Sequence, residues 1–191
     1  MNTRSLAIFA TALALAPTLA HAHPGHAAVD FAGGFAHPLL GSDHLLAMLA
    51  VGLWAAQLGG RARWLVPTAF VSVMTLGAAL GMTGEHLPLV EQGIMTSVLV
   101  LGVLIAAAAR LPLAASVALV GVCALFHGFA HGAEMPASAS GLRYAAGFAL
   151  ATAALHAAGL GLAWVAGKTA RLEWVRLAGA AIAVTAVFLV R

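Results

Sequence analysis

The feature of this sequence that most constrains its fold is a series of six apolar runs of roughly 18 to 24 residues, separated by short breaks. A helix needs about that length to cross the roughly 30 Å hydrocarbon core of a bilayer. The breaks hold glycine, proline and charged residues, and no connection is long enough to fold as a separate domain. The runs lie at 38–58, 64–83, 92–109, 112–131, 144–166 and 174–190. We therefore expect an all-α integral membrane protein with six transmembrane helices.

The composition supports this fold class. Of the 191 residues, 62% are hydrophobic and 8% are charged, whereas soluble domains carry about 25% charged residues. The net charge of +3 is too small and too scattered for a nucleic-acid surface, so we expect no nucleic-acid partner. A single cysteine, Cys123, excludes an intramolecular disulfide and any thiolate-rich metal cluster.

The first 22 residues have the pattern of a secretory signal peptide. Arg4 precedes an apolar run over residues 6–16, and Ala20-His21-Ala22 resembles an A-x-A cleavage site. We expect cleavage after Ala22, which leaves a membrane domain over residues 23–191. The alternative is an uncleaved first membrane helix. Either arrangement places the segment that follows outside the cytoplasm.

The basic residues predict how the helices are oriented. With the start outside, most of them fall on the cytoplasmic side, as the positive-inside rule requires. These residues are Arg61, Arg63, Arg110, Lys168, Arg171 and Arg176. Only Arg143 and Arg191 fall on the opposite side. We therefore expect a multi-pass protein of the cytoplasmic membrane whose mature N-terminus is periplasmic.

A first cluster of ionisable residues opens the first apolar run. It consists of His37, Asp43 and His44, with Pro38 suited to the first turn of the helix. On one continuous helix His37 and His44 would lie about 20° apart around the axis, nearly one above the other. Asp43 would point about 100° away, either toward a neighbouring helix or back to orient an imidazole, which strengthens a histidine as a metal ligand.

A second cluster closes the fourth apolar run. His127 and His131 are four residues apart and Glu134 follows three residues later, so all three lie on one stripe of a helix. Gly128 and Gly132 are also four apart. Such small residues let another backbone approach closely in membranes. We expect the approaching partner to be the first span.

Most other acidic residues and histidines fall on the same expected outer side. Three flank the connection between the second and third runs, where we expect an outer vestibule: Glu85, His86 and Glu91. His156 lies near the middle of the fifth run, where it would act as a deeper relay. His23 and His26 lie at the expected new N-terminus and could collect metal there.

Ionisable groups buried in a membrane are costly and usually functional. The two clusters could instead form hydrogen bonds between helices and hold the bundle together. Imidazole and carboxylate ligands suit divalent nickel, cobalt, zinc or copper, whereas magnesium and calcium prefer sites made of oxygen alone. The two clusters therefore predict a shared site for a transition-metal ion that crosses the membrane.

Two stretches also resemble a known family. HPLLGSDH at 37–44, continuing into LLAMLAVGLWAAQLGGRARWLVP, and FHGFAHGAE at 126–134 are similar to the HupE/UreJ family of small bacterial membrane proteins. The resemblance extends from about residue 23 to 191. It implies a secondary permease of the bacterial inner membrane for nickel, with cobalt as the cargo of some members, linked to maturation of NiFe hydrogenase or urease. It assigns the metal to His37, Asp43, His44, His127, His131 and Glu134.

Together these features predict a secondary transporter that moves Ni²⁺, or Co²⁺, from periplasm to cytoplasm. No P-loop motif is present, so the chain does not hydrolyse ATP itself. We expect no enzymatic activity and no permanently bound cofactor; the ion and the bilayer are the expected partners, and a homo-oligomer is left open. Two alternatives are a membrane-embedded zinc-dependent hydrolase and a haem-binding membrane protein with paired axial histidines.

Overall fold

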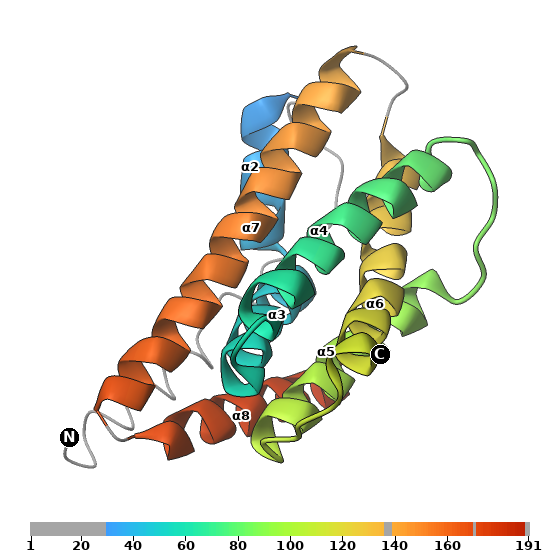
Figure 1. The fold of residues 1–191 in the computed structure, drawn as a ribbon. Coiled ribbons are helices and arrows are strands. Elements are labelled where there is room, and N and C mark those ends of the chain that lie inside the picture. The colour runs from blue at the N-terminus through green and yellow to red at the C-terminus, as the bar shows by residue number, and fades with distance from the viewer. Residues whose placement is uncertain (1–29, 136–138, 170, 190–191) are drawn as a thin grey trace.

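The computed structural model describes residues 30–135, 139–169 and 171–189. This part of the chain is helical (Figure 1), which confirms the expected all-α class. Its helices are α2 (Phe31–Leu40), α3 (Ser42–Leu58), α4 (Ala62–Gly81), α5 (Val90–Ala106), α6 (Leu113–Glu134), α7 (Ala139–Lys168) and α8 (Leu172–Leu189). The expected signal peptide, together with His23 and His26, lies outside the described residues.

The first expected span is broken into two helices, α2 and α3, which meet at an angle of 83°. The first of them, α2, begins before the expected start of the span. The side chain of Asp30 caps this helix by accepting a hydrogen bond of 2.8 Å from the Gly33 backbone N–H. Helix α2 ends where Gly41 adopts an extended conformation. The expectation that His37 and His44 share one face of one helix is therefore wrong. Pro38 lies near the end of α2 and not in a first turn.

Four described helices are long and apolar enough to cross a membrane, namely α4, α6, α7 and α8. The bent pair of α2 and α3 is a candidate fifth span, and α5 is an apolar helix of 17 residues. The structure therefore contains four to five candidate spans and is consistent with a multi-pass membrane protein. The full count of six stays a prediction.

The surface of the bundle is also that of a membrane protein. Large apolar side chains point outward on several helices, where a soluble protein would carry polar groups. Among the most exposed are Trp64, Leu76, Val122, Leu150, Leu162, Val184 and Phe188. Lipid is the solvent that this surface fits.

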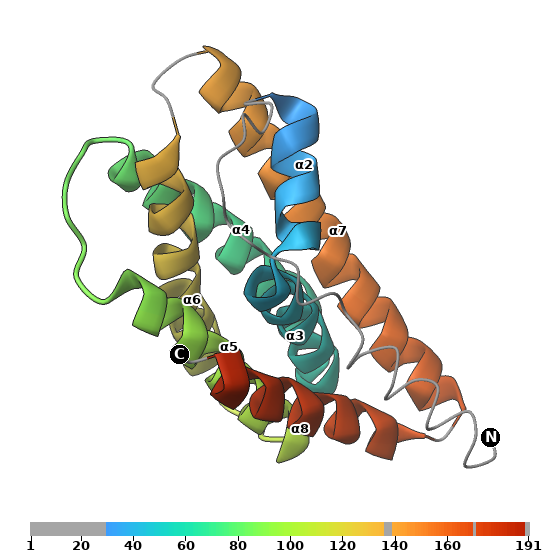
Figure 2. The same cartoon turned by 180° about the vertical axis from the view of Figure 1, so that it is seen from behind.

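The helices pack in close pairs: α4 with α6, α5 with α8, and α7 with both α2 and α3 (Figure 2). At the α4–α6 contact, a Cβ added to Gly128 or Gly132 would lie under 3.0 Å from the backbone carbonyl of Met74 or Ala78. The close approach expected at these glycines is present, but the partner is α4 and not the first span. The reason is that α4 carries matching small residues, Gly77 and Gly81, which meet the α6 backbone in turn.

Side chains from two neighbouring helices bind the carbonyl groups at the end of α5. The last carbonyls of a helix have no partner within it. Two of these carbonyls accept from side chains, Ile105 O from Gln57 Nε2 at 3.1 Å and Ala106 O from Arg176 Nε at 2.9 Å. The carbonyl of Ala109, in the connection just after α5, accepts from Trp54 Nε1 at 3.0 Å. We call this region, with the nearby helix ends that carry the Arg61, Arg63, Arg110 and Lys168 side chains, the basic end of the bundle.

Candidate metal centre

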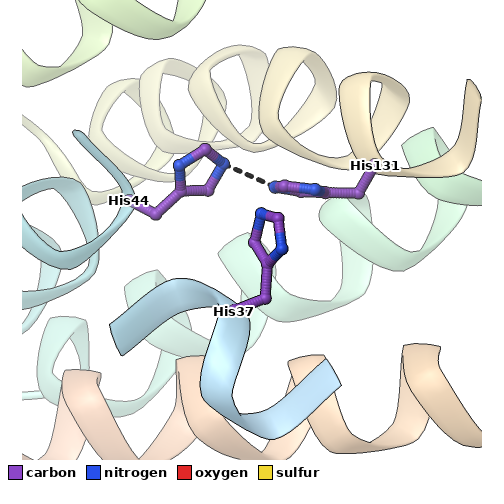
Figure 3. Close-up of side chains that lie close together, drawn as sticks. All are labelled: His37, His44 and His131. Carbon is purple, nitrogen blue, oxygen red and sulfur yellow. Dashed lines mark hydrogen bonds between the residues drawn. The ribbon is translucent and has the colours of Figure 1, made fainter. Parts of the chain in front are cut away.

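Three histidines from three different helices converge in the half of the bundle away from the basic end, and their rings point toward one another (Figure 3). His37 comes from α2, His44 from the first turn of α3 and His131 from the last turns of α6. Each offers one ring nitrogen, and these nitrogens all lie within 4.8 Å of one another. His44 and His131 are buried, with 7% and 6% of their surfaces exposed, and His37 is half-buried. We call this group the three-histidine site.

The break at Gly41 is what brings His37 and His44 together. It turns α3 away from α2, so that residues seven apart in sequence face each other across the bend, with ring centroids 5.7 Å apart. A Cβ on Gly41 would lie 3.2 Å from both Asp43 Oδ1 and His44 Nδ1. The missing side chain therefore leaves room for this carboxylate and this imidazole to meet.

Asp43 orients the imidazole of His44. Its Oδ1 lies 2.8 Å from His44 Nδ1, and because a carboxylate can only accept, Nδ1 carries the proton. His44 Nε2 is then left with its lone pair, which faces His131 Nε2 at 2.5 Å. Of the two directions considered for Asp43 from the sequence, the structure shows the one that orients an imidazole and raises its strength as a ligand.

Aromatic side chains from α7 enclose the three-histidine site. The ring of Phe148 lies 4.3 Å from that of His131, and Tyr144 lies 6.0 Å from His37, both measured between ring centroids. Beside His131, a cavity of about 130 Å³ opens between α4, α6 and α7. Three methionine side chains help to line it: Met74, Met82 and Met135. Aromatic rings therefore cover one side of the three-histidine site, and the small, largely apolar cavity adjoins it at His131.

His127 lies one helical turn from His131. It is not part of the three-histidine site but lies beside it. Its ring centroid is 5.1 Å from that of His44. His127 Nε2 lies 2.9 Å from the hydroxyl of Ser97, and that hydroxyl donates to Ile94 O at 2.6 Å. Ser97 must therefore accept the Nε2 proton, which leaves Nδ1 as the nitrogen with the lone pair.

Ser97 was missed from the sequence. The signal that could have found it is a hydroxyl inside the third apolar run, because a buried polar side chain in a membrane helix needs a partner. Its position gives no indication of which helix supplies that partner.

The remaining site residues predicted from the sequence are more scattered. Glu85 and His86 are exposed on the connection between α4 and α5, and Glu91 is exposed in the first turn of α5. Glu134 is the last residue of α6, and its side chain is not among those described. His156 is buried deep in α7. None of these four described side chains is part of the three-histidine site.

Comparison with known proteins gives two matches that cover most of the chain. The model of a family described as HupE / UreJ protein matches residues 11–189. The chain is also 48% identical over 172 residues to Protein HupE of Rhizobium leguminosarum bv. viciae, which covers 90% of each sequence. No solved structure matches the chain. Both comparisons agree with the two histidine motifs, and the chain therefore belongs to the HupE/UreJ family, whose members are transport and accessory proteins and not enzymes.

Proposed function

We propose that this protein is a secondary transporter that takes up Ni²⁺, or Co²⁺, from the periplasm and releases it into the cytoplasm for metalloenzyme maturation. One observation carries the proposal: three imidazoles from three helices bring their nitrogens within 4.8 Å of one another inside an apolar bundle. Membership of a family associated with nickel and cobalt transport for hydrogenase and urease supports it.

The donor set of the three-histidine site suits such an ion. Imidazole nitrogen is a good ligand for divalent nickel and cobalt and a poor one for magnesium or calcium. His44 offers a lone pair that Asp43 has already oriented. His131 Nε2 donates a proton to this lone pair, and when a cation binds between the two nitrogens this proton would move to Nδ1 of the same ring. Three ligands leave coordination positions for water, which allows the ion to be exchanged.

The proposal gives the other ionisable residues supporting roles around the three-histidine site. The exposed residues near the α4–α5 connection would form an outer vestibule that attracts cations: Glu85, His86 and Glu91. Glu134, at the end of the helix that carries His131, would supply a second carboxylate. His23 and His26 would collect metal at the N-terminus.

The direction of transport is inferred from charge. The basic residues gather at the helix ends opposite the three-histidine site, and basic residues favour the cytoplasmic side of a membrane. The site would then face the periplasm. Inward movement of a cation would be favoured by the membrane potential, which is worth about 2.3 kcal/mol per charge for each 100 mV.

The proposal is tested by uptake of radiolabelled nickel and cobalt into cells that lack other importers. We expect accumulation with the wild type and none with His44→Ala or His131→Ala, at equal amounts of membrane-inserted protein. Thr185→Val is a matched control, because the Thr185 hydroxyl donates to the carbonyl of Ala181 on its own helix, α8, away from the site. Normal uptake by both histidine variants would refute the proposed site.

A further inference from the structure

His156 is a buried histidine whose ring nitrogens make no hydrogen bond to any described part of the chain. Only 2% of its surface is exposed. The buried side-chain nitrogens and oxygens without a partner in the described structure are Gln57 Oε1, His127 Nδ1 and both nitrogens of His156. An unpaired imidazole in the middle of a membrane helix destabilises the protein, so its presence calls for a functional reason.

The position of His156 relates it to the three-histidine site. Phe148, Thr152 and His156 follow one another at intervals of four residues and so lie on one face of α7. Phe148 packs against His131, with ring centroids 4.3 Å apart. At 1.5 Å per residue, His156 lies about 12 Å further along the helix toward the basic end. His156 therefore lies on the same face of α7 as Phe148, the residue that contacts the three-histidine site.

A series of rings connects the two places. The ring of His127 lies 5.1 Å from that of His44. Phe70 of α4 lies 5.7 Å from His127 and 5.1 Å from His156, all measured between ring centroids. His127 also presents an unpartnered lone pair on Nδ1, because Ser97 holds the proton of Nε2. His127 therefore combines ring contacts to His44 and Phe70 with a nitrogen that is free to bind a cation.

The nearest polar side chain on the same face of α7 is neutral. Thr152, one turn from His156, directs its hydroxyl at the sulfur of Met74, with 3.8 Å between the two atoms. Imidazole nitrogen suits a borderline transition metal and not magnesium. A site built on a single imidazole would also hold a divalent cation loosely, as a site from which the ion moves on must do.

We propose that His156 is a second, deeper binding site for the transition-metal ion, reached from the three-histidine site by way of His127 Nδ1. The inference rests on the proposed function, since it assigns a further stage to the same cargo. Each transfer is an exchange of one neutral imidazole ligand for another. No proton or electron has to travel with the ion from His44 to His156, because a neutral imidazole always keeps one nitrogen lone pair.

The test compares His156→Leu with His156→Cys, both as full-length protein reconstituted in proteoliposomes. We expect His156→Leu to reduce the rate of Ni²⁺ uptake at least about tenfold, the effect typical of removing a metal-supporting group. His156→Cys, which restores a ligand for the ion, should recover part of that rate. Thr185→Val should transport like the wild type.

Thermal unfolding separates a ligand from a structural residue. Because His156 has no hydrogen-bond partner in the described structure, leucine should leave the unfolding temperature unchanged or raise it. A lower unfolding temperature for His156→Leu, or no recovery of transport with cysteine, would show that the residue serves packing and would overturn the inference.

Direct binding of Co²⁺ gives a second measurement. We expect purified protein with His44→Ala and His131→Ala together to retain a weak Co²⁺ absorption signal that disappears when His156→Leu is added. Absence of that signal overturns the inference. A wild type that takes up neither metal overturns the proposed function itself, whereas normal uptake by His156→Leu alongside inactive His44→Ala overturns only the second site.

Discussion

The two ends of this bundle use buried polar side chains in opposite ways. At the basic end, Trp54, Gln57 and Arg176 donate to backbone carbonyls at or just after the end of α5, so these side chains satisfy the main chain and tie helices together. At the three-histidine site, His44 and His131 face each other and Asp43 faces His44, so these contacts join side chains to side chains. The first arrangement supports the fold, whereas in the second a bound ion could replace the contact between the two imidazoles.

This difference predicts that function and stability can be separated by position. Removing polar groups from the three-histidine site should affect metal binding far more than folding. Removing them from the basic end should do the reverse. The following changes test that separation, in order of decreasing effect on transport.

The largest effect is expected when two ligands are removed together, with His44→Leu and His131→Leu. Binding of Ni²⁺ to the purified protein, measured by calorimetry, should be lost because a single imidazole remains in the site. The unfolding temperature should not fall, since two buried polar rings are replaced by apolar side chains. A marked loss of stability with intact metal binding would mean that the histidines act as structural contacts.

Asp43→Asn should have the next largest effect. An amide cannot fix the His44 tautomer as a carboxylate does, and loss of such a supporting group typically costs about 10–100-fold in metal affinity or activity. Uptake of Ni²⁺ at several concentrations measures the change. Asp30→Asn is the matched control: this exposed residue caps α2, and asparagine caps a helix equally well. Equal losses in both variants would contradict the role given to Asp43.

Ser97→Ala should reduce uptake by a smaller amount, about tenfold at most. It removes the acceptor for His127 Nε2 and so frees the ring to adopt the other tautomer. Ser116→Ala provides the comparison, because Ser116 is also buried but its hydroxyl binds the carbonyl of Pro112 on its own helix. If the two variants transport equally well, the tautomer of His127 does not matter.

The smallest effect on transport is expected at the basic end, with Trp54→Phe. The change leaves the carbonyl of Ala109 without its donor and should destabilise the protein by about 1–3 kcal/mol. The affinity for Ni²⁺ should stay at the wild-type value. Thermal unfolding and calorimetry on the same preparation measure both quantities, and a weakened affinity with unchanged stability would break the contrast between the two ends.

The sequence predicted the class of fold because long apolar runs leave few alternatives in a bilayer. It also placed His37, His44 and His131 among the expected ligands, since ionisable residues stand out in such runs. It did not predict the break at Gly41. The bent pair begins with a cap at Asp30, eight residues before the expected start of the helix, and its break uses space that only a missing side chain provides.

Contacts between helices were harder to predict than the helices themselves. Gly128 and Gly132 indicated a close approach, but the choice of α4 depends on small residues of another helix in matching positions. The same holds for Ser97, whose bond to His127 joins residues 30 apart in sequence. Periodicity describes one helix at a time and therefore contains no information on which faces meet.

The bend between α2 and α3 has a consequence for how the protein could change shape. Its two arms carry different histidines, His37 on α2 and His44 on α3, so a change in the angle between the arms would move these side chains apart. In the proposed transporter, an ion bound to both histidines would hold the arms at this angle, and a change at Gly41 would release the ion.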